Sequence, residues 1–331
     1  MSSIDRRSFL TCAAGALAPT LGALPRAALA GDYPDRPLRL VIPFAVGGAT
    51  DVIGRSYARF LGDRLGKPVA PDNRPGSGSL IGTDMVAKAA PDGYTILVAS
   101  LDGLVLQPAL RRSPPYDSRR DFTVITGIAS TPITFATSPA SGIRSMAELI
   151  ERARAQPGKI RYGSPGIGTS PHLAGQMLCK AAGISLTHVA YRGGAPAIGD
   201  LLGNHIELVA SVPADVVDKH QAGVCKVLAL TAPRRHSSLP DVTTLAELGY
   251  ADMVALHWVA LAAPVGLPAP VGARLAADAK AALDSAELNE QAARLGFELL
   301  HLAGADLNQF VDAERRRWSE IIRATGATLE G

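Results

Sequence analysis

The sequence contains few of the residues that build a disulfide scaffold. It has three cysteines in 331 residues, and one of them, Cys12, lies in an N-terminal segment described below. The two others, Cys179 and Cys225, are too few to form a scaffold. We expect Cys179 on a helix and Cys225 just before a strand, so we favour two buried thiols over a single bridge. With 47% apolar residues and no low-complexity tract, the chain can instead build a full hydrophobic core.

The motifs of several enzyme and cofactor classes are absent. The sequence has no Gly-x-Ser-x-Gly element and no Gly-Lys-Ser/Thr ending of a phosphate-binding loop, and its seven histidines lack metal-ligand spacing. The run Gly163–Gly168 does not have the glycine order of a dinucleotide site, and Pro165 removes one N–H donor from it. We therefore expect no cofactor, no metal and no catalytic residues. The absence of these motifs gives no support for an enzyme, but it does not exclude one.

The N-terminus has the pattern of a twin-arginine secretory signal. Arg6 and Arg7 precede an apolar, alanine-rich run, and the small residues Ala28 and Ala30 predict cleavage after Ala30. Prolines and an arginine interrupt the run, whereas a membrane anchor needs roughly 20 continuous apolar residues. We therefore expect residues 1–30 to be a signal peptide and the mature protein to be periplasmic.

The charge of the mature chain is close to neutral. Residues 1–30 carry three arginines and one aspartate, so their removal lowers the formal net charge from +3 to +1. Such a charge does not indicate a nucleic-acid or anionic-membrane partner.

Strand and helix patterns alternate along the 301 residues that follow this segment. This alternation predicts an α/β protein with parallel sheets covered on both faces. Long apolar strands at Phe122–Ala129 and His257–Ala263 interrupt it, and a short helix is predicted at Leu245–Leu248. We expect two α/β lobes joined by crossings near Phe122–Ala129 and Thr231–Met253. Lobe 1 would comprise residues 31–125 and 250–331, and lobe 2 residues 126–249, in the arrangement of a hinged ligand clamp.

The first strand and the turn after it define the principal candidate site. An apolar strand ends at Ile42, and Gly47 and Gly48 then allow the backbone to turn and a ligand to approach closely. Thr50 or Asp51 could cap the helix that follows. Because a helix N-terminus offers unpaired N–H groups and a partial positive charge, this turn suits a carboxylate or a phosphate. An ordinary strand-to-helix connection explains the pattern equally well.

Three loops lie between a predicted strand and a helix, at the sheet edge where ligands bind in α/β proteins. They are Phe44–Asp51, Ser77–Gly82 and Ser164–His172. In the third loop, Thr169 or Ser170 could serve as a helix cap instead of a ligand contact. Arg192, after another strand, either reaches a ligand carboxylate or is a solvated surface residue. We interpret His172 as structural and His257 as a core residue.

Longer motifs resemble those of a known family. These motifs are similar to those of the Bug (TctC-like) periplasmic solute-binding proteins of tripartite tricarboxylate transporters. They include Ile42–Asp51, Asp72–Gly78, Pro91–Thr95, Tyr162–Leu173 and Tyr191–Ala197. The resemblance covers nearly the whole mature chain. Two positions depart from the family pattern, because Arg192 replaces a common lysine and Asn204 a common glycine.

The resemblance implies a two-lobe periplasmic-binding-protein fold of type II with a ligand cleft between the lobes. In this family the first loop holds one carboxylate of a small organic acid through backbone groups and bridging waters, and the second lobe adds contacts. The candidate ligand-binding residues are Phe44, Ala45, Val46, Gly47, Gly48, Ala49, Asp51, Ser77, Ser100, Ser164, Gly166, Thr169, Ser170 and Tyr191.

The resemblance also implies the partners. We expect a monomer that hands its ligand to two membrane subunits of the transporter, or reports it to a sensor ectodomain. The alternative is a periplasmic enzyme acting on a small carboxylate, which turnover of the bound ligand would distinguish.

Overall fold

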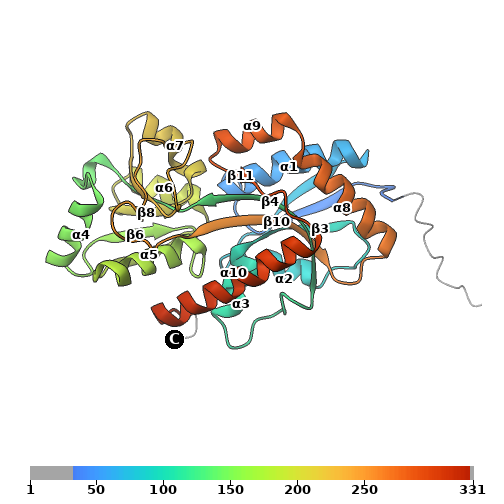
Figure 1. The fold of residues 1–331 in the computed structure, drawn as a ribbon, viewed down its shortest axis with the longest axis horizontal. Coiled ribbons are helices and arrows are strands. Elements are labelled where there is room, and N and C mark those ends of the chain that lie inside the picture. The colour runs from blue at the N-terminus through green and yellow to red at the C-terminus, as the bar shows by residue number, and fades with distance from the viewer. Residues whose placement is uncertain (1–32, 329–331) are drawn as a thin grey trace, which may run out of the picture. The chain divides into compact units, whose positions relative to one another are not determined.

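A computed structural model describes residues 33–328 of the chain, shown in Figure 1. The proposed signal peptide and its cleavage position lie outside the described residues. Within residues 33–328, no helix combines the length and the apolar character needed to cross a membrane.

In the described part of the chain, the first sheet has six strands in the order β11-β4-β10-β3-β1-β2. They are β1 (Leu38–Ile42), β2 (Val69–Asn73), β3 (Thr95–Ser100), β4 (Phe122–Pro132), β10 (Leu256–Pro264) and β11 (Glu298–Leu299). β1 is parallel to both β2 and β3, as predicted. β10 is antiparallel to β3 and β4, so the predicted parallel arrangement holds for β1–β3 and does not extend to the rest of this sheet. The reason is that β10 re-enters this sheet from the second one, in the opposite direction.

The second sheet has five strands among the described residues, in the order β7-β6-β8-β5-β9. They are β5 (Thr134–Thr137), β6 (Arg161–Ser164), β7 (Thr187–Ala190), β8 (Leu208–Ser211) and β9 (Lys226–Leu230). β6 is parallel to β7 and β8, and β5 is antiparallel to β8 and β9. The parallel strands place the loops after β6, β7 and β8 at one edge of the sheet.

Within residues 33–328, ten α-helices cover the sheets. They are α1 (Ala49–Leu65), α2 (Leu80–Ala87), α3 (Gln107–Ala109), α4 (Met146–Ala155), α5 (Ser170–Ala182), α6 (Gly194–Leu202), α7 (Pro213–Gln221), α8 (Ala269–Leu283), α9 (Ala286–Arg294) and α10 (Gly304–Thr325). A π-helical turn, η1 (Asp102–Leu106), precedes α3. The helix predicted at Leu245–Leu248 is a turn, because its four residues end at Gly249 in the left-handed region (φ +93°).

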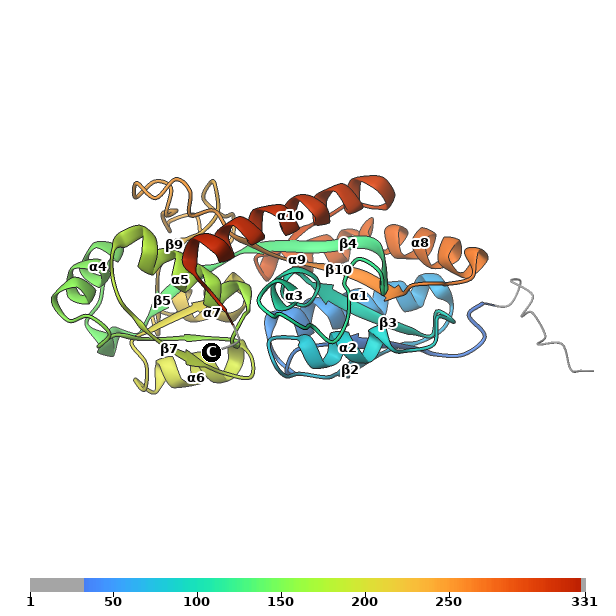
Figure 2. The ribbon, with the colours of Figure 1, turned by 90° about the horizontal axis from the view of Figure 1, so that it is seen from below.

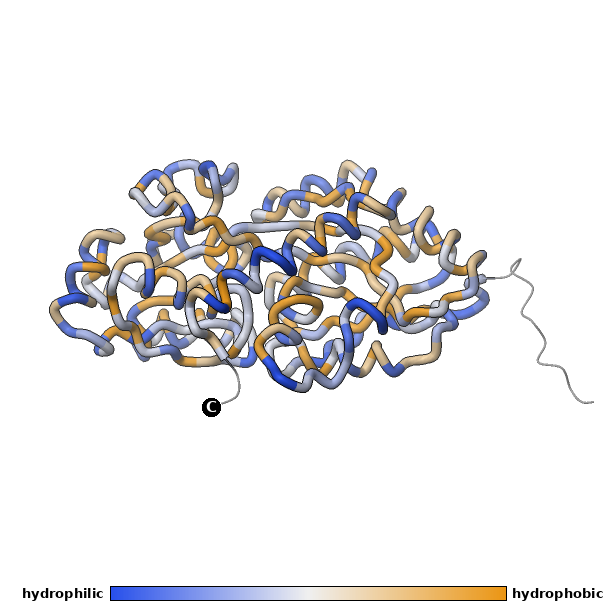
Figure 3. Tube along the Cα trace, turned by 60° about the horizontal axis from the view of Figure 1, so that its bottom comes forward, coloured by the Kyte–Doolittle hydropathy of each residue, from blue (hydrophilic) through white to orange (hydrophobic). Residues whose placement is uncertain are grey.

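Helix α1 illustrates how the sequence pattern builds the core. Ile53, Tyr57 and Leu61 recur at helical spacing, and all three are fully buried against the first sheet. The Tyr57 hydroxyl donates a hydrogen bond to the carbonyl of Ala279 on α8, 2.8 Å away. Hydrophobic and hydrophilic residues alternate along the helices in Figure 3.

Two chain segments connect the sheets, as Figures 1 and 2 show. β4 continues directly into β5, and the segment after β9 returns the chain to β10. The buried residue Thr231 joins the two connections, because its Oγ1 accepts a hydrogen bond from Ile133 N (2.8 Å) and its carbonyl accepts one from Ala255 N (3.0 Å). The chain therefore crosses between the sheets through a pair of hydrogen-bonded segments.

The end of helix α6 accounts for one departure from the family pattern. Asn204 has a φ of +59°, in the left-handed region where glycine is most favourable. Asparagine is among the few other residues that adopt this conformation readily. The substitution therefore preserves the helix end.

Candidate functional site

Two adjoining cavities lie where loops of both sheets meet. The smaller has a volume of about 40 Å³. Its lining residues are Phe44, Ala45, Val46, Gly48, Ala49, Thr50, Asp102, Pro165, Pro171, Gly193, Gly194, Ala195, Val212, Asp215 and His257. The larger has a volume of about 340 Å³ and shares Phe44 and Pro165 with the first. Its other lining residues are Pro43, Pro75, Gly76, Ser77, Gly78, Ser79, Arg111, Gly166, Ile167, Ala190, Tyr191 and Arg192.

The turn after β1 forms one wall of the smaller cavity. Helix α1 begins at Ala49 with Gly48 as its N-cap, and no side chain caps it, so the proposed capping by Thr50 or Asp51 was wrong. Asp51 instead accepts a hydrogen bond from Gly47 N at 2.9 Å, and from Asn73 Nδ2 at 2.7 Å. The Asp51 carboxylate therefore holds the turn after β1 in place through these hydrogen bonds.

The ionisation of Asp51 follows from these contacts. Burial would raise its pKa, but the hydrogen bonds from Arg55, Gly47 and Asn73 together lower it. Arg55 Nε lies 2.8 Å from the carboxylate, one helical turn away. Asp51 is thus an ionised, buried group that holds the loop and does not line either cavity.

The loop after β6 uses its hydroxyl groups internally. Ser164 Oγ lies 2.7 Å from His188 Nε2, and Thr169 Oγ1 donates to the carbonyl of Gly166 at 2.7 Å. Thr169 is the N-cap residue of α5, without a capping hydrogen bond from its side chain. These hydroxyls shape the loop, which reaches the cavities through Pro165, Gly166 and Ile167.

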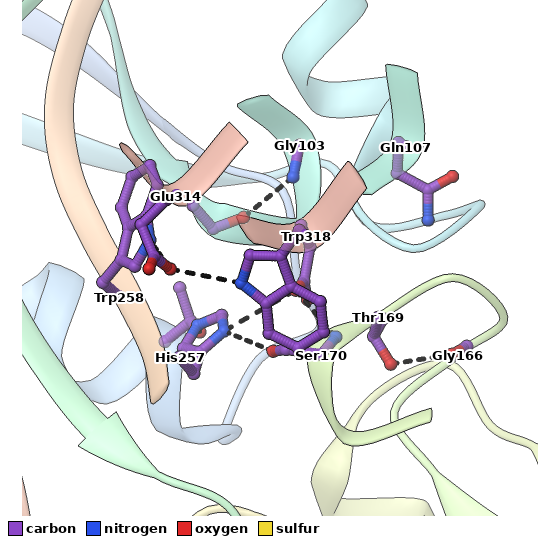
Figure 4. Close-up of polar contacts among 12 residues, drawn as sticks. Gly103, Gln107, Gly166, Thr169, Ser170, His257, Trp258, Glu314 and Trp318 are labelled. Atoms are coloured by element: carbon purple, nitrogen blue, oxygen red, sulfur yellow. Dashed lines mark hydrogen bonds and ion pairs between the residues drawn. The ribbon is translucent and has the colours of Figure 1, made fainter. Parts of the chain in front are cut away.

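A buried polar group at the floor of the smaller cavity joins the two sheets. Asp102 Oδ1 accepts a hydrogen bond from Ser170 N at 2.9 Å, and Ser170 Oγ lies 3.0 Å from His257 Nδ1. Figure 4 shows the side chains of His257 and Ser170 pointing toward each other. A Ser-His-Asp relay requires the serine and the aspartate at opposite nitrogens of the imidazole. Here both oxygens face Nδ1, and His257 Nε2 faces Thr50 Oγ1 at 3.5 Å, so the group does not form that relay.

Asp215, on helix α7, contacts the start of helix α1 at the backbone N–H of Ala49. It lies in the first turn of α7 and accepts a hydrogen bond from Ser211 Oγ. Burial raises its pKa, while Ser211 and the backbone N–H groups of Val212 and Ala49 oppose the shift. A Cβ at Gly194 would overlap this carboxylate, so only glycine fits there without displacing it.

The structure brings together most, but not all, of the residues predicted for the site. Phe44, Ala45, Val46, Gly48 and Ala49 line the smaller cavity, and Phe44, Ser77, Gly166 and Tyr191 line the larger. The remaining predicted residues support the walls without lining them: Gly47, Asp51, Ser100, Ser164, Thr169 and Ser170. Ser100, for example, accepts a hydrogen bond from Gly103 N at 3.2 Å.

Sequence reasoning missed four polar residues of the smaller cavity, Thr50, Asp102, Asp215 and His257. Asp102 and Asp215 follow strands β3 and β8 closely, at the edge where ligands bind, and this position could have signalled them. His257 was interpreted as core, and at 4% exposure it is buried, yet it also lines the cavity. No group of three metal-ligating side chains occurs in the described part of the chain, and its cysteines, Cys179 and Cys225, are free thiols.

Comparison with known proteins identifies the fold class first. The structure of the periplasmic binding protein BugD has a TM-score of 0.85 and 33% sequence identity, covering 89% of this chain and 99% of that one. A structure of an R. palustris protein with adipate has a TM-score of 0.86 and 29% identity, covering 90% and 99% of the two chains. The chain therefore has the two-lobe periplasmic-binding-protein fold.

The family follows from the sequence matches. Residues 53–327 match the model of the tripartite tricarboxylate transporter family receptor, TctC. The protein BugT of Bordetella pertussis is 34% identical over 307 residues, which are 91% of this chain and 93% of BugT. The chain belongs to the TctC family, whose Bug members are solute-binding proteins. The resemblance of its motifs to that family is confirmed.

Proposed function

We propose that this protein binds a small organic acid in the two adjoining cavities and delivers it to a transporter of the tripartite tricarboxylate type, or to a sensor. One observation carries the proposal. Loops that follow strands of both sheets line the same pair of cavities, and these loops contain eight of the fourteen residues predicted from the sequence. A site shared by two sheets fits a clamp that closes on its ligand.

The smaller cavity suits a single carboxylate group. The N-termini of α1 and α6 both reach it, through Ala49 and Gly194, and helix N-termini favour an anion. A water molecule needs about 10–15 Å³ of such volume, so a cavity of about 40 Å³ has room for a carboxylate but not for a whole ligand. The rest of the ligand would extend past Phe44 and Pro165 into the larger cavity.

The two acidic residues beside this carboxylate are already compensated. Asp102 accepts the N–H of Ser170 at the start of α5, and Asp215 accepts the hydroxyl of Ser211. Their charges are therefore partly neutralised by the protein. The N–H of Ala49 is already bonded to Asp215, and the other N–H groups of the first turn of α1 would remain for the ligand.

The two lobes would close through the segments that connect the sheets. We propose the boundaries expected from the sequence, with lobe 1 formed by residues 31–125 and 250–331 and lobe 2 by residues 126–249. Support comes from the strands, because β1–β4, β10 and β11 belong to one sheet and β5–β9 to the other. The end of β4, residues 126–132, belongs to the first sheet and is the exception to this division. The hinge would lie at Ile133, Thr231 and Ala255.

The cellular role follows from the family and from the N-terminal sequence. We propose a periplasmic monomer without a nucleic-acid partner, working with two membrane subunits of the transporter. It is not an enzyme in this proposal, because the polar cluster of Ser170, His257 and Asp102 lacks the geometry of a nucleophile relay.

The test is thermal unfolding of the protein purified from the periplasm of an expressing bacterium, against a panel of mono-, di- and tricarboxylates, aromatic acids and amino acids. A ligand at roughly 100 times its Kd adds about 2.7 kcal/mol to the free energy of unfolding. For a chain of this size, we expect the midpoint to rise by several degrees. Mass spectrometry of the recovered ligand distinguishes the roles, since a binding protein returns it unchanged. Turnover, or no shift with any acid, would contradict the proposal.

A further inference from the structure

A buried glutamine joins the two sheets beside the larger cavity. Gln107, the first residue of α3, donates a hydrogen bond from Nε2 to the backbone carbonyl of Ile167, 3.0 Å away in the loop between β6 and α5. Figure 4 shows the amide nitrogen of Gln107 on the side of this loop, which also carries Gly166 and Thr169. The contact therefore links the connection between β3 and β4 of the first sheet to a loop of the second sheet.

The side-chain amide of Gln107 has a partner at each end. Its oxygen accepts a hydrogen bond from the guanidinium of Arg111, which has only donors, so its nitrogen faces the Ile167 carbonyl. Gln107 is fully buried, and water therefore cannot replace either bond when the amide is removed. The side chain of Ile167 is 52% exposed, so the contact across the sheets depends on its backbone carbonyl.

Gly78 meets this contact from a third loop, the one between β2 and α2. Its φ is +60°, and a Cβ there would overlap Gln107 Nε2 and lie 2.6 Å from the Ile167 carbonyl oxygen. A Cβ at Gly166 would lie 3.7 Å from the Cα of Gly78, so the loops of the two sheets meet through glycine backbone. A side chain at position 78 would therefore push Gln107 and Ile167 apart.

The contact bears on the larger cavity, because Gly78 and Ile167 both line it. When the hydrogen bond from Gln107 breaks and the two loops separate, the cavity loses one wall, and an acid held there loses the contacts of that wall. Both bonded groups belong to the protein, so the strength of the bond does not depend on which acid is bound.

We propose that Gln107 is a positioning residue that holds the loop after β6 against the first sheet, and that position 78 must be glycine for this contact to form. The Gln107–Ile167 contact shifts the equilibrium toward the form in which the sheets meet, and it strengthens binding although Gln107 lines neither cavity. The effect on affinity rests on the proposed function, whereas the contact itself can be measured without a ligand.

Hydrogen–deuterium exchange of the protein, purified from the periplasm and dialysed exhaustively, tests the contact. The reporter is the amide of Ser170, which donates to Asp102 Oδ1 across the two sheets at 2.9 Å. At the first position of α5 this N–H has no partner within the helix, so it exchanges when the sheets separate. Mass spectrometry with electron-transfer fragmentation measures its rate.

The variant Q107E removes the donor and keeps the size of the side chain. Its carboxylate still accepts from Arg111, but it places an acceptor oxygen against the carbonyl of Ile167. We expect the Ser170 amide to exchange about 10-fold faster than in the wild type, the effect of one buried hydrogen bond lost. Q309E makes the same change at an exposed glutamine of α10 and should stay within about twofold of the wild-type rate.

Two glycines provide a second, uncharged comparison. G78A and G183A both place alanine at a left-handed φ, +60° and +61°, but a Cβ at Gly183 meets nothing within 4 Å. We expect exchange of the Ser170 amide to be at least about 10-fold faster in G78A than in G183A. Amides of α4, whose residues line neither cavity, serve as the internal reference.

The same glycine pair measures the effect on binding, because a new carboxylate at position 107 would itself repel an anion. The probe is the acid that gives the largest rise of the midpoint in the unfolding panel. Its Kd, from titration calorimetry, should be about 10-fold weaker in G78A than in G183A.

Three results overturn the inference and leave the proposed function intact. They are exchange of the Ser170 amide at the wild-type rate in Q107E, equal exchange in G78A and G183A, and an equal acceleration in α4, which would indicate global unfolding. Conversely, if no acid binds to the wild type but the exchange rates differ as expected, the contact stands and the proposed function fails.

Discussion

The Nδ1 atom of His257 lies 3.0 Å from the Oγ atom of Ser170, and this contact joins the first sheet to the helix that opens the second half of the site. His257 is the second residue of β10, and Ser170 is the first residue of α5. Because both side chains are buried, water cannot replace the hydrogen bond when one partner is removed. The contact therefore stabilises the arrangement in which both cavities are formed.

Substitution of Ser170 tests this contact. We expect S170A to weaken ligand binding about 5- to 10-fold and to lower the free energy of unfolding by about 1 kcal/mol, the net value of one buried hydrogen bond. Titration calorimetry and urea unfolding measure the two effects. S185A, at an exposed serine of the same region, is the control. Unchanged affinity in S170A would show that the contact does not contribute to the binding-competent form.

Two glycines of helix α6 offer a matched pair. A Cβ at Gly194 overlaps the Asp215 carboxylate, whereas one at Gly199 meets nothing within 4 Å. We expect G194A to weaken binding at least about 10-fold, because displacement of Asp215 alters the smaller cavity. G199A should leave binding unchanged and raise the free energy of unfolding by about 0.5–1 kcal/mol, since alanine is the better helix former. Equal affinities of the two variants would contradict the role of Asp215.

The pair His172 and His188 predicts sensitivity to acid. Their ring centroids are 4.1 Å apart; burial lowers the pKa of His172 to about 4, and burial with the neighbouring His172 lowers the pKa of His188 to about 3. An unfolded histidine has a pKa near 6.5, so below that pH the unfolded chain binds protons that the folded chain does not. Stability is therefore complete above about pH 6.5 and falls as the pH decreases toward about 4.

Urea unfolding at several pH values between 7 and 5 measures this loss. The variant H188Q should show a shallower dependence on pH, because one proton-binding site is removed from the unfolded chain. H205Q changes an exposed histidine and should keep the slope of the wild type. The same slope in all three proteins would mean that other groups cause the sensitivity.

Glu314 ties helix α10 to the first sheet. Its Oε2 accepts hydrogen bonds from the indole nitrogens of Trp258 and Trp318, each at 3.2 Å, as Figure 4 shows. E314A leaves two buried donors unpaired, so we expect a loss of about 2–4 kcal/mol in the free energy of unfolding. E320A, at an exposed position of the same helix, should have little effect. Because these are the two tryptophans of the chain, their fluorescence reports the unfolding transition directly. Similar midpoints for the two variants would contradict the assignment.

Export through the twin-arginine pathway is tested by replacing Arg6 and Arg7 with lysines. We expect the variant to remain uncleaved in the cytoplasm, whereas the wild-type protein should reach the periplasm with Gly31 as its first residue. Cell fractionation and intact mass determine both. Periplasmic protein of the expected mass from the variant would indicate export by another route.

Local patterns determined most of the elements. The apolar run before Pro43 became β1, and the spacing of Ile53, Tyr57 and Leu61 became the buried face of α1. Hydrophobic periodicity predicts such elements because each must bury one face. The family motifs predicted the two-lobe fold, since they lie in the turns that follow the strands.

The tertiary structure alone decided which side chains reach the cavities. Ser164, Thr169 and Ser170 have the right type and position along the chain, yet their hydroxyls contact their own loop or His257. Asp102, Asp215 and His257 belong to η1, α7 and β10, and only the packing of the two sheets places them around one cavity. Spacing along a chain describes neighbours within one element, whereas a cleft between sheets is formed by residues far apart in sequence. The sequence by itself therefore determined the elements and the family, and the direction of each side chain was decided by long-range packing.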